Sequence, residues 1–130
     1  MKYLLDTLPF LRWISNAAKL PPAVVEVIKS PEHSIYLSIA SVREIQVKSQ
    51  IGKVDLPSPV LDIVLQQNQA NGIEMLQISL AHMVQLTRIP TLHGDPFDYL
   101  LISQSIVEDM TIITNDSRIT QYPIKTWWGT

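Results

Sequence analysis

Five short apolar stretches recur along the chain, each bounded by polar residues, glycine or proline. They are rich in β-branched, leucine and aromatic side chains and are too short for a buried helix, which is typical of buried strands. The predicted strands are Lys2–Leu5, Ser34–Ile39, Glu74–Ile78, Thr111–Thr114 and Ile124–Thr126.

Between these strands the apolar residues follow helical spacing, and start and stop signals mark the ends of each segment. Prolines stand where a first helical turn accepts them, and Gly52 and Gly72 stand where a left-handed residue ends a helix. The predicted helices run from about Pro9 through Ile14, from Pro22 to before Pro31, over Ser41–Ile51 and Val60–Ala70, from Ser79 through Leu86 or Ile89, from Pro96 to about Glu108, and over Asp116–Thr120. Strands alternating with helices predict a three-layer α/β fold, with a short, mostly parallel sheet flanked by helices.

Length and composition narrow the class of protein. A chain of 130 residues, 46% of them hydrophobic, is expected to form one domain over residues 1–130. Ten basic against twelve acidic residues give no basic field of the kind that marks nucleic-acid binding, and the absence of cysteine excludes disulfides and thiolate zinc sites. No apolar stretch approaches the roughly 20 residues of a membrane span. No export signal is visible, so we expect a cytoplasmic protein without a membrane association.

Carboxylates fall where an α/β fold places its ligands, which is the carboxyl edge of the sheet near a switch in strand order. Asp6 follows the first predicted strand directly, and Asp116 lies two residues beyond the Thr111–Thr114 strand. Glu44 and Asp98 each stand in the first turn of a predicted helix. The fold therefore predicts that these four acids approach one another at one edge of the sheet.

Each acid also has a purely structural interpretation, because acids favour helix starts. Ser41 and Glu44 match a capping box, and Asp95 before Pro96 matches an N-cap followed by proline at the first helical position. Asp6 and Asp116 could each cap the helix that follows it.

Two of the acids nevertheless head helical stripes that face the core, with no lysine or arginine on the same stripe. The stripes are Asp98, Ile102, Ser105 and Ile106, and Glu44, Val47 and Ile51. Because unpaired burial of a carboxylate is costly, a compensating cation is expected. Oxygen ligands alone favour Mg²⁺, with Mn²⁺ as a substitute.

Four segments, in chain order, resemble the conserved blocks of the PIN-domain ribonucleases. They are residues 3–7 (YLLDT), 38–45 (SIASVREI), 93–102 (HGDPFDYLLI) and 114–116 (TND). The nearest resemblance within that family is to the VapC toxins of VapBC toxin–antitoxin pairs, and Gly52-Lys53, Tyr122 and Trp127 also fit that branch.

The resemblance implies a Mg²⁺-dependent endoribonuclease, dimeric, inhibited by a cognate antitoxin, and acting as the toxin of a type II pair. The catalytic and metal-ligating residues it implies are Asp6, Glu44, Asp98 and Asp116; Thr114 would lie beside the ion, and Asp95 would reach the site through water. Leu8, Pro9 and Tyr99 depart from the family's pattern without removing an acid, which leaves substrate preference open.

The chemistry of the residues agrees with this expectation. Hard cations held by carboxylates can activate water and stabilise a departing oxygen, and no glycine-rich phosphate loop is present. Arg12, Arg43 and Arg118 are candidates for contacts with RNA phosphates, together with Lys48 and Lys53, although all five could be ordinary solvated charges. The three histidines share no ligand spacing, so we expect no histidine metal site, and His93 is expected to order its loop.

Two alternatives stay open. A PIN-like domain without catalytic activity could serve as a protein- or RNA-binding module, and metal affinity distinguishes it from the enzyme. A phospho-acceptor signalling domain would need adjacent acids after the first strand, and Asp6 stands alone. Clustered carboxylates also predict at least one raised pKa, and with it an activity that falls on acidification.

Overall fold

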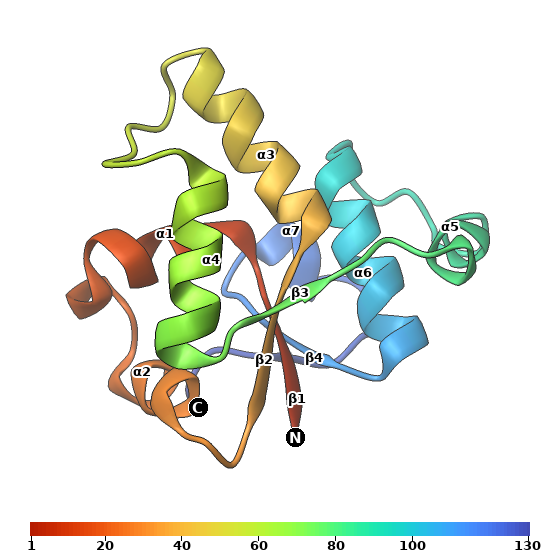
Figure 1. The fold of residues 1–130 in the computed structure, drawn as a ribbon. Coiled ribbons are helices and arrows are strands. Elements are labelled where there is room, and N and C mark those ends of the chain that lie inside the picture. The colour runs from red at the N-terminus through yellow and green to blue at the C-terminus, as the bar shows by residue number, and fades with distance from the viewer.

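The computed structural model describes residues 1–130 and contains one five-stranded sheet in which all pairings are parallel. The strands are β1 (Lys2–Leu5), β2 (Ser34–Ser38), β3 (Glu74–Leu76), β4 (Thr111–Ile113) and β5 (Thr126–Trp127). Their order is β3-β2-β1-β4-β5, so the chain builds outward from the central β1 to β3 and then crosses to β4 on the other side (Figure 1). The strand order therefore switches between β1 and β4, where an open α/β sheet places its ligand.

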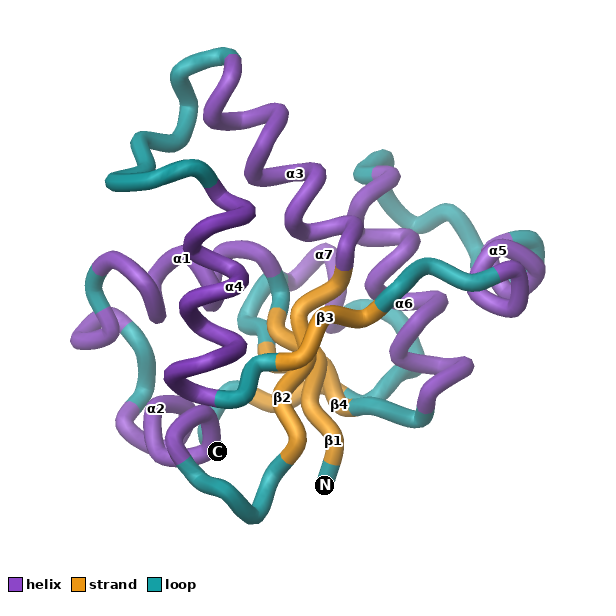
Figure 2. The backbone as a smooth tube through the Cα atoms, in the orientation of Figure 1, coloured by secondary structure: helices purple, strands orange, loops and turns teal.

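Helices cover both faces of this sheet (Figure 2). They are α1 (Thr7–Ser15), a 3₁₀ turn η1 (Ala17–Lys19), α2 (Pro22–Lys29), α3 (Ile39–Gln50), α4 (Val60–Asn71), α5 (Leu80–Leu86), α6 (Pro96–Glu108) and α7 (Ser117–Thr120). The predicted three-layer α/β architecture is confirmed. None of the helices is both long enough and apolar enough to span a membrane.

Alternation along β1 divides the core into two clusters. Tyr3 and Leu5 point to one face and join residues of α1, α2, α3 and α4, whereas Leu4 points to the other face and joins residues of α6 and α7. Leu4 and Leu5 are completely buried. A strand that is buried on both faces has a continuous run of apolar residues, and this pattern in residues 3–5 predicted β1.

Several predicted helix ends are confirmed. Gly72 ends α4 with φ +69°, and Gly52 follows α3 with φ +77°, the left-handed conformation that glycine adopts without strain. Three acids cap helices: the side chains of Asp6, Asp95 and Asp116 accept backbone N–H groups at the starts of α1, α6 and α7.

Some boundaries differ from the prediction. β2 ends one residue early because the hydroxyl of Ser38 accepts the N–H of Ala40, which starts α3 at Ile39. The predicted capping box of Ser41 and Glu44 is therefore wrong, because both residues lie inside the helix. The last strand is displaced from Ile124–Thr126 to Thr126–Trp127, and the side chain of Ile124 packs against the smaller core cluster instead.

Candidate functional site

The four predicted acids line one cavity of about 450 Å³ at the carboxyl edge of the sheet. Asp6 follows β1, Asp116 stands before α7, Asp98 lies in the first turn of α6, and Glu44 lies in α3. Because α3 starts earlier than predicted, Glu44 lies beyond its first turn and points from the helix toward the cavity. Four elements that are distant in sequence thus bring four carboxylates to the switch in strand order.

Asp6 is buried at the end of β1, with a relative exposure of 6%. Its carboxylate accepts the backbone N–H of Thr7 at 2.8 Å and the hydroxyl of Thr114 at 2.8 Å. Burial raises the pKa of Asp6 to about 6, and the negative charges of Asp98 and Glu44 add to the rise. The expected elevated pKa is present, although burial contributes more to it than the neighbouring carboxylates do.

Glu44 has a cation of its own. Lys48, one helical turn further along α3, lies with Nζ 2.6 Å from Oε2, and the hydroxyl of Thr7 donates to Oε1 at 2.8 Å. The premise that no basic residue compensates Glu44 is therefore wrong, because Lys48, four residues further on, lies beside Glu44 at the edge of the apolar stripe. The stripe itself also ends early, since Ile51 is largely exposed.

Asp98 is buried and accepts a hydrogen bond from His93, whose Nε2 lies 2.9 Å from Oδ2. Burial raises the pKa of Asp98, and the hydrogen bond from His93 opposes that rise. Its predicted stripe is buried at Ile102 and Ser105, whereas Ile106 is exposed. His93, which we predict to order its loop, bonds to Tyr122 and also contacts a candidate ligand.

Asp116 differs from the other three acids because it is partly exposed and firmly paired. Arg118 donates to it through Nε at 3.2 Å and Nη2 at 2.8 Å, and also through its backbone N–H at 2.9 Å. The hydrogen bond from the Arg118 side chain is the main cause that lowers the pKa of Asp116 below its ordinary value. Asp116 therefore stays ionised over the whole neutral range.

Asp95 and Thr114 support this arrangement from two sides. Asp95 Oδ1 accepts the N–H groups of Phe97 and Asp98, so its capping role is confirmed, and it also lines the cavity. The hydroxyl of Thr114 donates to Asp6 and accepts the N–H of Asp116 at 3.0 Å. Thr114 thereby fixes the distance between two of the four acids.

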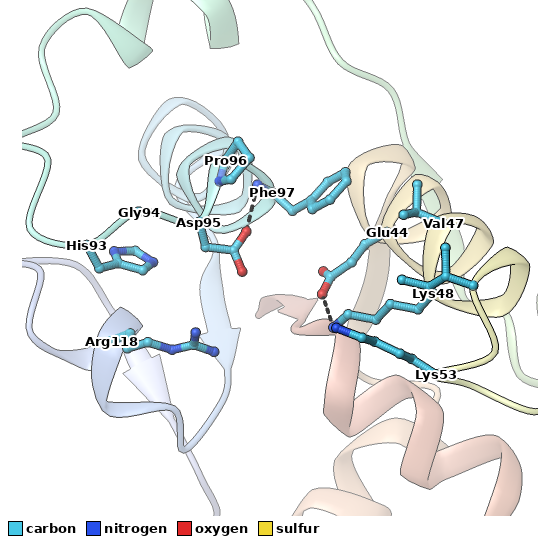
Figure 3. A pocket seen from close by; sticks show the side chains of 11 residues that line it. Glu44, Val47, Lys48, Lys53, His93, Gly94, Asp95, Pro96, Phe97 and Arg118 are labelled. Atoms are coloured by element: carbon cyan, nitrogen blue, oxygen red, sulfur yellow. Dashed lines mark hydrogen bonds and ion pairs between the residues drawn. The ribbon is translucent and has the colours of Figure 1, made fainter.

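A second cavity of about 540 Å³ shares residues with the first and opens it into a cleft. Figure 3 shows Lys48 and Lys53 extending from the α3 side and Arg118 from the α7 side toward the gap between them. The basic residues that line the cleft are therefore Lys48, Lys53 and Arg118. Arg12 and Arg43 do not line either cavity, so of the three predicted RNA contacts only Arg118 lies at the cleft.

The carboxylates of the site are engaged by the chain itself. Seven of the eight carboxylate oxygens of the four acids have a protein partner, and Asp98 Oδ1 is the exception. No three acidic or histidine side chains lie close enough together here to coordinate one ion. The donor set nevertheless fits Mg²⁺ or Mn²⁺, because it consists of oxygens alone. The two cations that occupy it, Lys48 and Arg118, belong to flexible and partly exposed side chains.

Some contacts around these acids join residues that no single predicted motif contains. Thr7 and Ser41 form a hydrogen bond between their hydroxyls at 2.9 Å that links α1 to α3 beside Glu44. The i,i+4 spacing of Glu44 and Lys48 was visible in the sequence and could have been used. The contact between His93 and Tyr122 spans 29 residues, and no local pattern marks it.

Comparison with known proteins identifies the family. The PIN domain family matches residues 3–125, so the chain belongs to it, and members of that family are nucleases. No curated protein matches the sequence. The fold is similar to a chain in the crystal structure of VapBC2 from Rickettsia felis bound to a DNA fragment from their promoter, with TM-score 0.74, 18% identity and 98% of each chain covered.

Two further solved structures have a similar fold. The DNA-bound VapBC of Salmonella typhimurium gives a TM-score of 0.73 at 15% identity, covering 98% of this chain and 97% of that chain. VapBC-1 from nontypeable Haemophilus influenzae gives 0.69 at 16% identity, with 100% of both chains covered. At such identities the similarity shows a shared fold over the whole length of these chains.

Proposed function

We propose that this chain is a divalent-metal-dependent endoribonuclease that hydrolyses phosphodiester bonds of RNA. Asp6, Glu44, Asp98 and Asp116 are the proposed metal ligands and catalytic residues, with Mg²⁺ as the ion and Mn²⁺ as a substitute. The observation that carries the proposal is the convergence of these carboxylates on one cavity, at the switch in strand order of a PIN-domain fold.

A divalent ion in such a site lowers the pKa of a bound water and neutralises charge on the phosphate. The chain's own residues hold the ligands for this task. Thr114 and the N–H of Thr7 fix both oxygens of Asp6, and the hydroxyl of Thr7 fixes Oε1 of Glu44. Water adds to phosphorus, one P–O bond breaks, and the proton of the water passes to the departing oxygen.

The cleft supplies the contacts to the substrate. Arg118, Lys48 and Lys53 line it, and their charges fit the phosphates of a strand that passes over the carboxylates. Lys48 and Arg118, which pair with Glu44 and Asp116 in the metal-free chain, would be available for these phosphates if the carboxylates held an ion instead.

We also propose that the chain acts as the toxin of a type II toxin–antitoxin pair in the cytoplasm, as a homodimer inhibited by a cognate antitoxin. The support is the fold that it shares with chains of the VapBC complexes. Apolar side chains exposed on α4 and α5, such as Leu65 at 64% and Leu80 at 80%, offer surfaces for protein partners.

The test is cleavage of labelled single-stranded RNA by the purified protein with Mg²⁺, with and without a chelator. We expect cleavage that the chelator abolishes, and a loss on the order of 100-fold in the Asp98→Asn variant, because an ion stabilises the transition state by several kcal/mol. Asp109→Asn is the matched control: Asp109 ends the same helix, is exposed, and has a left-handed backbone that asparagine tolerates.

RNA binding without any cleavage would support the alternative of an inactive binding module. One observation favours that alternative, namely that seven of the eight carboxylate oxygens are held by partners within the chain. Calorimetric titration with Mn²⁺ separates the two functions, since only the enzyme requires an ion that binds through Asp98.

A further inference from the structure

A buried series of hydrogen bonds leads from the C-terminal part of the chain to Asp98. Tyr122 Oη lies 2.8 Å from His93 Nδ1, and His93 Nε2 lies 2.9 Å from Asp98 Oδ2. The side chains of His93 and Asp98 are 9% and 6% exposed, and Tyr122 is 3% exposed.

The partners of these groups define where each proton lies. The backbone N–H of Leu92 can only donate, and it lies 3.0 Å from Tyr122 Oη, so that oxygen accepts. The Tyr122 hydroxyl is then free to donate its own proton to His93 Nδ1. An ionised Asp98 can only accept, so His93 Nε2 carries the hydrogen. One arrangement of hydrogen bonds satisfies every group: His93 donates from Nε2 to Asp98 and accepts the hydroxyl of Tyr122 at Nδ1.

This arrangement determines which oxygen of Asp98 is available. Oδ2 is occupied by His93, and Oδ1 is the one oxygen among the four acids without a protein partner. Ring contacts hold the imidazole in place, because Tyr99 and Tyr122 both meet it edge to face, at centroid distances of 5.3 and 5.5 Å. The orientation of Asp98 therefore depends on His93, which in turn depends on Tyr122.

We propose that His93 is a positioning residue for Asp98: held in the Nε2–H form by Tyr122, it presents Oδ1 alone to a divalent ion. The inference rests on the proposed function, because it assigns a role toward the ion that the enzyme would use. It also links two parts of the site, since the N–H of Tyr122 donates to Ile119 in α7, the helix that Asp116 caps.

The protonation of His93 is tested first, in the metal-free protein, by the ¹⁵N chemical shifts of its imidazole ring at neutral pH. We expect the Nε2–H form, with a change in the Nδ1 shift in Tyr122→Phe. The ring of His82 is the internal control, since it accepts the N–H of Ser79 and contacts Glu108, and neither His82 nor Glu108 lines the cleft. A proton on His93 Nδ1 would overturn the proposal whatever the protein's activity.

The role toward the ion is tested by calorimetric titration with Mn²⁺. We expect His93→Leu to weaken binding by about 10- to 100-fold, the usual cost of removing a group that orients a metal ligand. His93→Gln restores most of the affinity, because its amide nitrogen reaches the position of Nε2 and can donate to Asp98. His82→Leu is the matched control, another buried histidine bonded to a carboxylate, and it lowers the melting temperature without changing ion affinity.

The outcomes distinguish this inference from the proposed function. A wild-type protein that binds no ion would overturn both. Ion binding that His93→Leu leaves unchanged, with only the melting temperature lowered, would overturn the role of His93 alone. Loss in His93→Leu with no recovery in His93→Gln would also count against it, because packing rather than hydrogen bonding would then explain the loss.

Discussion

Asp6 carries a charge that its surroundings disfavour. Its folded-state pKa is raised from 3.8 to about 6, chiefly by burial, so the folded chain binds this proton more tightly than the unfolded chain does. The stabilising contribution is complete below about pH 4 and is lost as the pH rises through about 6. Two pKa units correspond to roughly 3 kcal/mol, which the ionised carboxylate costs the metal-free fold at neutral pH.

Asp6→Asn should therefore stabilise the metal-free protein. The amide keeps the acceptor for the N–H of Thr7 and can donate to Thr114, whose hydroxyl reverses its role. We expect a gain of about 1–3 kcal/mol at pH 7.5, which disappears near pH 4. Thermal melts with a chelator at both pH values check it, and Asp109→Asn should show no such gain. A destabilised Asp6→Asn at pH 7.5 would mean that the charge of Asp6 is compensated in the fold.

The four acids could be predicted from sequence because each stands at a fixed offset from the end of a strand or the start of a helix. Their partners could not, for two physical reasons. The contact between Lys48 and Glu44 depends on which rotamers two long side chains adopt. The contact between His93 and Tyr122 joins two loops that are 29 residues apart in the sequence. Whether two such loops meet depends on the conformation of the chain between them, which the residues next to His93 and Tyr122 do not determine.

Among the helices and strands, boundaries were harder to predict than identities. Ser38 and Ser41 both offer a hydroxyl at the start of α3, and the sequence does not say which one caps it. The earlier serine caps the helix, because Ser41 Oγ instead meets the hydroxyl of Thr7 on α1. The choice between two possible caps therefore goes with a tertiary contact, which the local sequence does not contain.

The end of α4 allows the effect of a left-handed backbone conformation to be tested separately from steric clash. Gly72 adopts φ +69° with open space around the position of a Cβ, so a substitution there meets strain and no clash. We expect Gly72→Ala to lower the free energy of unfolding by about 1–2 kcal/mol, the cost of a left-handed alanine. Gly94→Ala is the matched control, since Gly94 also has open space but no positive φ. Urea denaturation measures both, and equal losses in the two variants would contradict the assignment to backbone conformation.

In α3, Lys48 and a divalent ion would compete for the carboxylate of Glu44. Lys48→Met should tighten Mn²⁺ binding by about two- to fivefold in the absence of RNA, because a pair whose lysine is this exposed contributes at most about 1 kcal/mol. Calorimetric titration measures the change. Lys29→Met, at the end of α2 and outside the cleft, should leave the affinity unchanged. Weaker Mn²⁺ binding in Lys48→Met would show that the lysine supports the site instead of competing for it.

For the whole molecule, alternating strands and helices predicted the layers, whereas the order of the strands had to come from the structure. Any crossover from β3 back to the far side of β1 satisfies the same apolar pattern. The order decides the site, because it brings the loop after β4 beside the end of β1 and so joins Asp116 to Asp6 through Thr114.

The charge of the whole chain is −2, so affinity for RNA has to come from the local arrangement of cations at the cleft. Among the three arginines predicted to contact RNA, Arg118 lines that cleft, and Arg12 and Arg43 do not. We therefore expect RNA binding to depend on salt through Arg118. Each contact with a phosphate of a single strand contributes about 0.7 to the slope of log affinity against log salt concentration.

Arg118→Ala should reduce that slope by about 0.7, whereas Arg43→Ala and Arg12→Ala should leave it unchanged. Fluorescence anisotropy of a labelled single-stranded RNA over a series of salt concentrations measures it, in an Asp98→Asn background so that the RNA stays intact. The expected difference follows from position alone, because all three residues carry the same charge. A slope that falls equally in Arg43→Ala would place the RNA on the outer face of α3, and the cleft would then serve the reaction without guiding the strand.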